Sequence, residues 1–225
     1  MSAAQPRQPV PVFPLPELVL FPGATVPLHV FELRYRTLVR DALSRDRTIA
    51  LALLLPGFEI DYHGSPAFHP LGCLARFDEV EWLLDDRYNL KVVGTMRVRF
   101  DRVISEFPYR SMRVELLPQD PYDENDPLVG MEKRALLELY DRLRALALEA
   151  SAEAAATLPV LAANDRFEHV VNTLCMYCGQ PAAERMAFLA ENSLVERARR
   201  VRECLERVFG ATRRRRSPPA TGEAN

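Results

Sequence analysis

The sequence predicts an α+β protein in which a half made of antiparallel strands precedes an α-helical half. Two patterns support this prediction. Between residues 73 and 117, apolar and polar side chains alternate, which is typical of antiparallel strands with one buried face and one face in water. From residue 127 onward, apolar residues recur at helical spacing instead. An acidic, proline-rich segment, residues 119–126, lies between the two halves and is predicted to be a linker.

The strand half is expected to begin after a flexible polar arm, residues 1–9. Val10–Phe13 is predicted to be the first strand. Prolines then divide residues 13–30 into short apolar runs, which are typical of edge strands, and Pro22-Gly23 predicts a tight turn. The apolar positions of residues 32–45 fit a helix.

Further strands follow this predicted helix. An all-apolar run, Ile49–Leu55, predicts a buried strand, and Pro56–Pro70 predicts an unusually long loop. The alternating region predicts a hairpin and a final strand: Cys73–Leu84, a turn at Asp85-Asp86, Tyr88–Val93 continuing through Met96–Val103, and Arg110–Leu117. Gly94 interrupts the return strand and predicts a bulge or a corner of the sheet.

The second half, residues 127–210, is predicted to be a bundle of helices. Asp126-Pro127 is a favourable helix start, because an N-cap side chain precedes a proline at the first position. The expected helices are 127–149, 165–177, 182–190 and a last one from a capping box at Ser193–Glu196 to Gly210, with 151–157 either extending the first or forming a short second piece.

The tail, residues 211–225, is expected to be disordered, because it joins a basic run to a Ser/Pro segment with nothing to bury. Arg213–Arg216 is compatible with weak, salt-sensitive binding to nucleic acid. A solubilising tail is the favoured interpretation, since a short arginine run carries no geometry for reading a groove.

Composition favours an ordinary soluble protein. The chain has 225 residues, of which 48% are hydrophobic and 27% are charged, and a net charge of −2. This charge gives no overall attraction to nucleic acid or to an anionic membrane. No apolar run approaches the roughly 20 residues that span a bilayer, and the first residues lack the apolar core of a signal peptide. We therefore expect no membrane association, a cytoplasmic location and four reduced cysteines.

The sequence predicts no catalytic residues, no metal site and no cofactor. Cys175 and Cys178 have CxxC spacing, but they follow a predicted helix, where the helix dipole opposes a thiolate. A zinc site would need two more ligands, and no second CxxC pair is present. Packing in the core is the favoured interpretation of both cysteines. Sequence signatures for a phosphate-binding loop, a nucleophile elbow or HExxH are also missing, which favours a protein that is not an enzyme.

The proline-rich segment near the start of the chain, together with the beginning of the first predicted helix, resembles a known family. The matching segments are Phe13–Pro16, Leu20–Gly23, Pro27–Glu32 and Arg34–Arg36. They resemble the opening of the N-terminal, substrate-binding domain of Lon protease, including the small bacterial proteins that carry that domain without the ATPase and protease modules. The resemblance implies a PUA-like antiparallel β-barrel over residues 10–118, followed by a C-terminal α-helical bundle.

The same resemblance implies a binding function, because this domain of the family is implicated in engaging substrate polypeptides and in assembly. We expect non-catalytic binding of unfolded or extended polypeptide, or of a specific protein partner, in a groove between barrel and bundle or along a strand edge. Formation of a homo-oligomer is possible, and the sequence does not decide it. The candidate contacts are rings of the long loop and two residues of the opening segment: Phe58, Tyr62, Phe68, Pro22 and Tyr35.

Two alternatives compete with this interpretation. The aromatic rings of the long loop could instead cap the open end of the barrel. We favour this interpretation of the rings over peptide binding, because aromatic side chains are heavily buried on average. PUA-like barrels elsewhere bind RNA, so an RNA-binding module is the second alternative. The acidic net charge and the lack of a basic stripe along the strands make nucleic acid unlikely.

Overall fold

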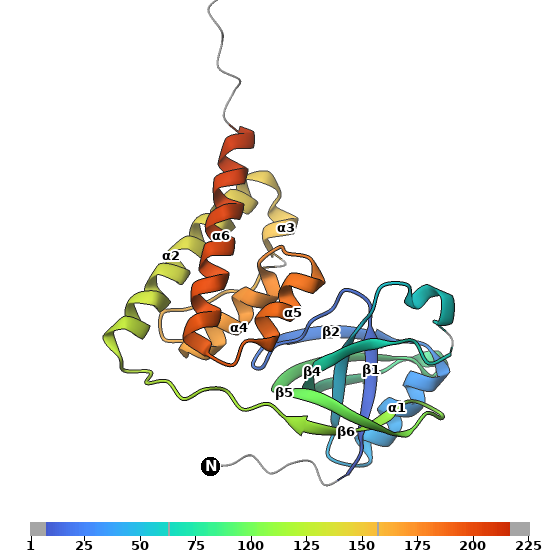
Figure 1. Cartoon of the computed structure of the whole chain (residues 1–225). Coiled ribbons are helices and arrows are strands. Elements are labelled where there is room, and N and C mark those ends of the chain that lie inside the picture. The colour runs from blue at the N-terminus through green and yellow to red at the C-terminus, as the bar shows by residue number, and fades with distance from the viewer. Residues whose placement is uncertain (1–7, 63, 157, 217–225) are drawn as a thin grey trace, which may run out of the picture.

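A computed structural model describes residues 8–62, 64–156 and 158–216. It contains a strand part and a helical part that follow one another along the chain (Figure 1). The strand part comprises β1 (Val10–Leu15), β2 (Thr25–Val30), α1 (Leu33–Leu43), β3 (Thr48–Leu54), the 3₁₀ turn η1 (Phe58–Asp61), β4 (Phe68–Trp82), the 3₁₀ turn η2 (Leu84–Asp86), β5 (Tyr88–Ser105) and β6 (Ser111–Leu116).

The strands close into a ring. Their order is β2-β5-β4-β3-β1-β6, and a further pairing of β5 with β6 joins the two ends of a five-stranded barrel. Strand β2 stays outside the ring, on the first half of β5. Every pairing is antiparallel except that of β1 with β3, which is parallel because α1 crosses over between them. The predicted PUA-like barrel followed by a helical bundle is confirmed, with a mixed rather than fully antiparallel sheet.

A small apolar cluster fills the ring. All five ring strands contribute to it, for example through Val12, Ala50, Leu74, Val98 and Val114. The alternation seen in the sequence produces this arrangement, because every second side chain of a strand points to the same face. The outward faces of β3, β4 and β5 belong to a second, larger cluster that also includes α1 and the helical part.

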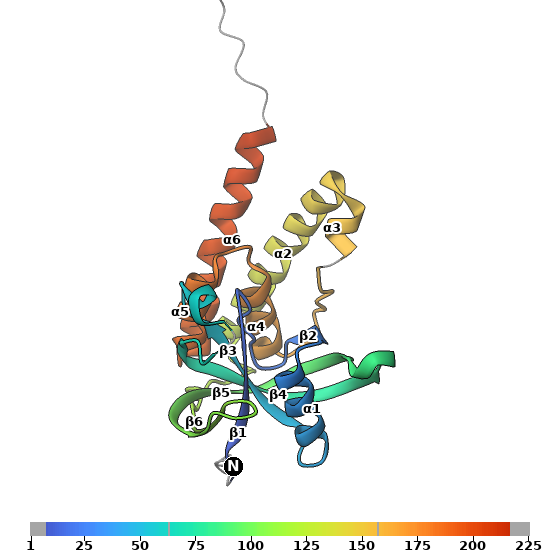
Figure 2. The ribbon, with the colours of Figure 1, turned by 90° about the vertical axis from the view of Figure 1, so that its right-hand side faces the viewer.

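The helical part comprises α2 (Pro127–Ala150), α3 (Ala152–Ala156), α4 (Phe167–Tyr177), α5 (Ala182–Ala190) and α6 (Leu194–Arg216). Figures 1 and 2 show α4 and α5 next to the barrel, whereas the far ends of α2 and α6 point away from it. Since the larger apolar cluster runs from the strands into α4, α5 and α6, the division into separate barrel and bundle domains stays a prediction.

Local signals for the helices were mostly correct. The carboxylate of Asp126 accepts a hydrogen bond from the amide of Leu128 at 2.8 Å, so it caps α2 as predicted. At α6 the hydroxyl of Ser193 accepts from the amide of Glu196 at 3.3 Å, but the carboxylate of Glu191 takes the other role expected of Glu196. Glu196 pairs with Arg199 instead, so the predicted capping box is only half formed.

Two predicted boundaries were wrong, and one was correct. The last helix does not end at Gly210 but continues to Arg216, because a single glycine only weakens a helix. The long loop ends before Phe68, which is the first residue of β4. The ordered strand region begins at Val10, while residues 1–7 of the expected arm and 217–225 of the expected tail lie outside the described residues.

Gly94 and a β-bulge beside it hold the Pro22-Gly23 turn against the sheet. Between the pairs Leu74–Met96 and Ala75–Gly94 the register shifts by one residue, which confirms the predicted bulge. The amide of Gly94 donates to the carbonyl of Ala24 at 2.9 Å, and the amide of Gly23 donates to the carbonyl of Gly94 at 2.8 Å. The Pro22-Gly23 turn is therefore held directly against β5.

Candidate functional site

The five predicted contact residues do not form one site. Phe58 lies on η1 and lines a groove between the barrel and α5. Tyr62 follows η1 and is half-buried, and Tyr35 is buried in α1 with 6% of its surface exposed. Their use in binding stays a prediction. Phe58 and Tyr62 lie side by side, with ring centroids 6.0 Å apart, and the guanidinium of Arg34 lies over the rings of both Tyr62 and Tyr35.

Tyr62 fixes the loop to the start of α1. Its hydroxyl donates a hydrogen bond to Glu32 Oε1 at 2.7 Å, which together with partial burial raises the pKa of Tyr62. Arg34 donates to the carbonyls of Tyr62 and Gly64, at 2.7 and 3.1 Å, and pairs with Glu32 at 3.1 Å. The loop that presents Phe58 is therefore anchored before any ligand arrives.

Tyr35 has a structural position. Its ring stacks on Phe13 with centroids 4.4 Å apart, and burial raises the pKa of its hydroxyl to about 12. The residue also lines a separate cavity of about 340 Å³, which lies between α1 and the β5–β6 hairpin that carries Phe107.

Phe68 and Pro22 also contribute to packing. The ring of Phe68 meets that of Phe100 edge-on, with centroids 5.0 Å apart, and the guanidinium of Arg110 lies 4.8 Å from its centroid. The interpretation of the loop rings as a barrel cap therefore fits Phe68. The carbonyl of Pro22 accepts a hydrogen bond from Asn172 of α4 at 3.0 Å, so this turn belongs to the contact between barrel and bundle.

The groove that includes Phe58 is the strongest candidate site. It has a volume of about 420 Å³ and is lined mostly by carbon. Its barrel wall consists of Pro16 and the end of β3 through Pro56, and its opposite wall is the first turn of α5, with Ala182, Ala183 and Met186. A groove of this size, mostly apolar and formed where two parts of a protein meet, is the usual setting for a ligand.

Few polar groups border this groove. They are the exposed carboxylates of Glu17 and Glu59 and the imidazole of His69. Burial lowers the pKa of His69, whose Nδ1 accepts a hydrogen bond from the amide of Leu71 at 3.2 Å. At pH 7 the histidine is therefore neutral, and the charge at the rim is negative.

Helix α5 adds main-chain donors at the groove. The first amides of a helix have no acceptor within it, and the N-cap of α5 is Pro181, which provides no side-chain hydrogen bond to them. Ala182 and Ala183, the first residues of α5, line the groove. The site thus combines apolar walls with the kind of donor that binds a peptide carbonyl.

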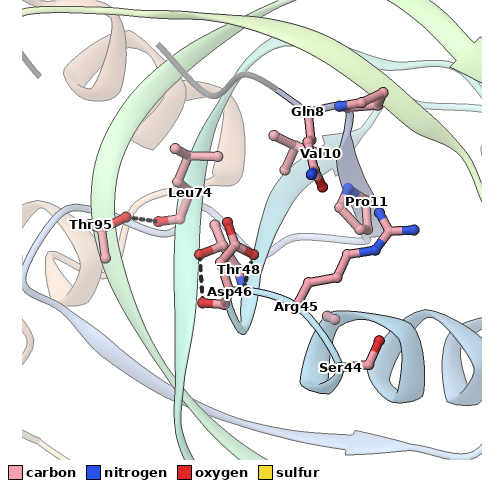
Figure 3. Close-up of a pocket in the computed structure, with 11 residues that line it drawn as sticks. Gln8, Val10, Pro11, Ser44, Arg45, Asp46, Thr48, Leu74 and Thr95 are labelled. Atoms are coloured by element: carbon pink, nitrogen blue, oxygen red, sulfur yellow. Dashed lines mark hydrogen bonds between the residues drawn. The ribbon is translucent and has the colours of Figure 1, made fainter. Parts of the chain in front are cut away.

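A larger hollow of about 710 Å³ lies at the other end of β1 (Figure 3). Its labelled lining residues include Arg45, Asp46 and Thr48, and Asp46 accepts a hydrogen bond from the amide of Thr48 at 3.2 Å. Gln8, the first described residue, forms one wall. The lining of this hollow is about as polar as it is apolar, and we therefore give the more apolar groove at α5 precedence.

A chain of buried hydrogen bonds positions α5 against the barrel. Arg97 of β5, 2% exposed, donates to the carbonyls of Leu189, Glu191 and Pro118 and to Asn192 Oδ1, all between 2.8 and 3.0 Å. Arg197 of α6, which is fully buried, donates to Asn172 and also to the carbonyl of Glu191.

Sequence reasoning missed this arginine pair. The alternation of residues 73–117 predicts that the polar side chains face water, and Arg97 is one of these side chains. That face is covered by the segment joining α5 to α6, and burial lowers the pKa of Arg97 to about 10, with the neighbouring charge of Arg197 acting in the same direction. The scarcity of lysine and the abundance of arginine in the sequence did not indicate that these two arginines are buried.

The cysteines have the predicted structural position. Cys175 and Cys178 are buried in the core, and burial raises the pKa of Cys175 to about 12. Among the residues that the structure describes, no group of three or more His, Cys, Asp and Glu side chains has the arrangement of a metal site. The described helices also include none that is long and apolar enough to span a membrane.

The closed five-stranded ring, the extra strand β2 and the attached helices define a PUA-like barrel domain with a C-terminal helical bundle. Within this class the chain belongs to a particular family. The family model described as the ATP-dependent protease La (LON) substrate-binding domain matches residues 9–207, and this is the part of the chain that contains both the barrel and the groove.

Relatives agree with this assignment. The chain is 27% identical over 206 residues to Lon protease 2 of Myxococcus xanthus, an alignment that covers 89% of this chain and 24% of the relative. It is 31% identical over 110 residues to Lon protease 2 of Sorangium cellulosum, covering 49% of this chain and 14% of the relative. The chain thus spans about a quarter or less of these proteins, and their activities are not thereby its own.

Solved structures show the same fold. The Lon N-terminal domain protein from Xanthomonas campestris superimposes with a TM-score of 0.57 at 24% identity, covering 90% of this chain and 98% of that one. The N-terminal domain of the Mycobacterium avium complex Lon protease gives a TM-score of 0.56 at 17% identity, with 88% and 98% covered. At these identities the similarity concerns the fold alone.

Proposed function

We infer that this chain binds segments of unfolded or extended polypeptide in the groove between the barrel and α5, without catalysing a reaction on them. The observation that carries this proposal is the apolar groove itself, with Phe58 on its barrel wall. The family supports a role in substrate recognition, since its model describes a substrate-binding domain. A specific protein partner with an extended segment would use the same contacts.

The groove matches what an extended peptide needs. An apolar side chain would enter between Phe58 and Met186, and the carbonyls of the peptide would meet the first amides of α5. Ile60, which is 94% exposed on η1, would extend the apolar contact beyond the groove. Because Arg34 and Tyr62 already hold the loop, little conformational entropy would be lost on binding.

Strand addition at the sheet edge is the weaker alternative. Among the described strands β2 pairs only with β5, so its other edge is unpaired there. Pro27 lies in the middle of β2. Since proline has no amide hydrogen, an added strand would lose a donor at this position, and prolines of this kind protect sheet edges from pairing.

The first test fills the groove. Replacing Ala183 by tryptophan is expected to weaken binding of a neutral peptide about ten-fold or more, because Ala183 lines the groove and its exposed position on α5 accommodates a larger side chain without unfolding. The peptide carries a Leu-Phe core between Gly-Ser flanks with both ends blocked, and its affinity is measured by titration calorimetry. Ala135→Trp, at an exposed position of α2 away from the groove, is the matched control.

A second test removes the ring from the groove. Phe58→Ala is expected to weaken binding of the same peptide about five-fold, which corresponds to about 1 kcal/mol of lost apolar contact. Phe107→Ala provides the comparison, since this ring is 87% exposed and lies at the other cavity. Equal effects of the two substitutions, or a tight complex with the Ala183→Trp variant, would place the peptide elsewhere.

A further inference from the structure

The rim of the groove carries charge that a purely apolar peptide would not use. Glu17 and Glu59 both line it, one before β2 and one on η1, and both are exposed. Within the described part of the chain, neither carboxylate forms an ion pair or a side-chain hydrogen bond. Both are therefore available to a ligand without breaking an existing contact.

The positive charges near the groove do not cancel these carboxylates. Arg185 of α5 donates a hydrogen bond to the main-chain carbonyl of Glu17. The start of α5 adds about half a positive charge, and Glu184 in its first turn opposes that charge. His69 is neutral at pH 7 because burial lowers its pKa. Glu17 and Glu59 on the groove lining, with Glu184 beside it, thus oppose the guanidinium of Arg185 and the helix dipole.

We propose that the groove selects polypeptide segments in which an apolar anchor is flanked by lysine or arginine, and that it discriminates against segments flanked by aspartate or glutamate. This inference rests on the proposed function, because it assumes that the anchor occupies the groove. The apolar walls hold the anchor, and Glu17 and Glu59 hold the flanking cations. Long basic side chains suit this role, since their stems cover apolar surface while the charge stays in water.

The discrimination is expected to be moderate and sensitive to salt. Exposed ion pairs contribute little individually, and the same carboxylates that attract a basic flank repel an acidic one. We therefore expect a basic-flanked peptide to bind about ten-fold more tightly than an acidic-flanked one at low salt. Because the Debye length falls to roughly 3 Å at 1 M salt, the ratio should fall toward unity there.

Three peptides with one Leu-Phe core and blocked ends test this, with Lys, Glu or Gly-Ser flanks, each titrated calorimetrically into the full chain. The expected order of affinity is Lys, then neutral, then Glu. In the double variant Glu17→Gln with Glu59→Gln the three affinities should converge to within about two-fold. Glu138→Gln, an exposed position on α2, should leave the order unchanged.

The outcomes separate the two proposals. Equal affinity for the Lys- and Glu-flanked peptides, with the neutral peptide still excluded by Ala183→Trp, overturns the charge preference and leaves the groove as the binding site. A preference that persists in the double variant overturns it as well, because the carboxylates named here would not be its source. No binding of the neutral peptide by the unmodified chain overturns the proposed function itself.

Discussion

Replacing Arg97 by methionine should lower the free energy of unfolding by about 3 kcal/mol, the largest loss we expect from one side chain. The guanidinium donates to four acceptors that lie in the contact between barrel and bundle. Methionine keeps the apolar stem but donates nothing, so buried carbonyls lose their partners, and each unsatisfied group costs about 1–3 kcal/mol. Water reaching some of them limits the total.

Arg99→Met is the matched control for this substitution. Arg99 lies two residues further along β5, faces the same side of the strand and is exposed. The same chemical change there should alter stability by less than about 0.5 kcal/mol. Urea unfolding monitored by circular dichroism measures both variants. Similar stabilities for the two would mean that the buried hydrogen bonds of Arg97 contribute no more than a surface arginine does.

The Arg97 substitution should also affect binding. Arg97 holds the carbonyls of Leu189 and Glu191, which are at the end of α5 and just beyond it. The first turn of the same helix is one wall of the groove. A change in the position of α5 would therefore alter the width of the groove, and peptide affinity should fall in Arg97→Met under conditions where the protein remains folded.

Arg97 also shows where sequence reasoning reached its limit. Alternation along β5 identified correctly which residues share a face, because that depends only on neighbouring residues. It could not tell whether water or another part of the chain covers the face. The covering segment lies more than 90 positions further on, at Leu189–Asn192, and its contribution is mostly main-chain carbonyls, which every residue has.

The candidate site was predictable to a similar extent. Phe58, which lines the groove, could be selected from the sequence as an aromatic residue in a long loop, a local signal, while its use in binding stays a prediction. The wall formed by Ala182, Ala183 and Met186 carries no such signal, since small and flexible apolar residues of a helix are ordinarily read as core. Only the fold brings this helix beside β3. Tyr35 was selected as an aromatic residue in a family motif, but its ring stacks on Phe13 within the larger apolar cluster outside the ring of strands.

Gly94→Ala should lower the free energy of unfolding by about 2–3 kcal/mol, although it adds a single methyl group. A Cβ atom at this position would lie 2.2 Å from the carbonyl oxygen of Phe21 and 3.1 Å from Leu20 Cγ. The oxygen belongs to the main chain of the segment that leads into the Pro22-Gly23 turn, so it cannot rotate away. Relief requires the turn to move off β5, which weakens the hydrogen bonds between Gly94 and Ala24 and between Gly94 and Gly23.

The same substitution at Gly130 should have the opposite sign. Gly130 lies inside α2, and the nearest atom to an added Cβ is Arg134 Nη1 at 3.8 Å, an ordinary contact. Alanine stabilises a helix interior by about 1 kcal/mol relative to glycine. Thermal unfolding of the Gly94→Ala and Gly130→Ala variants tests both expectations. A change of 1 kcal/mol in the free energy of unfolding shifts the melting temperature by about 2–4 °C. A melting temperature that rises in both variants would show that the Pro22-Gly23 turn separates easily from β5. The contact between this turn and β5 would then not determine where the turn lies.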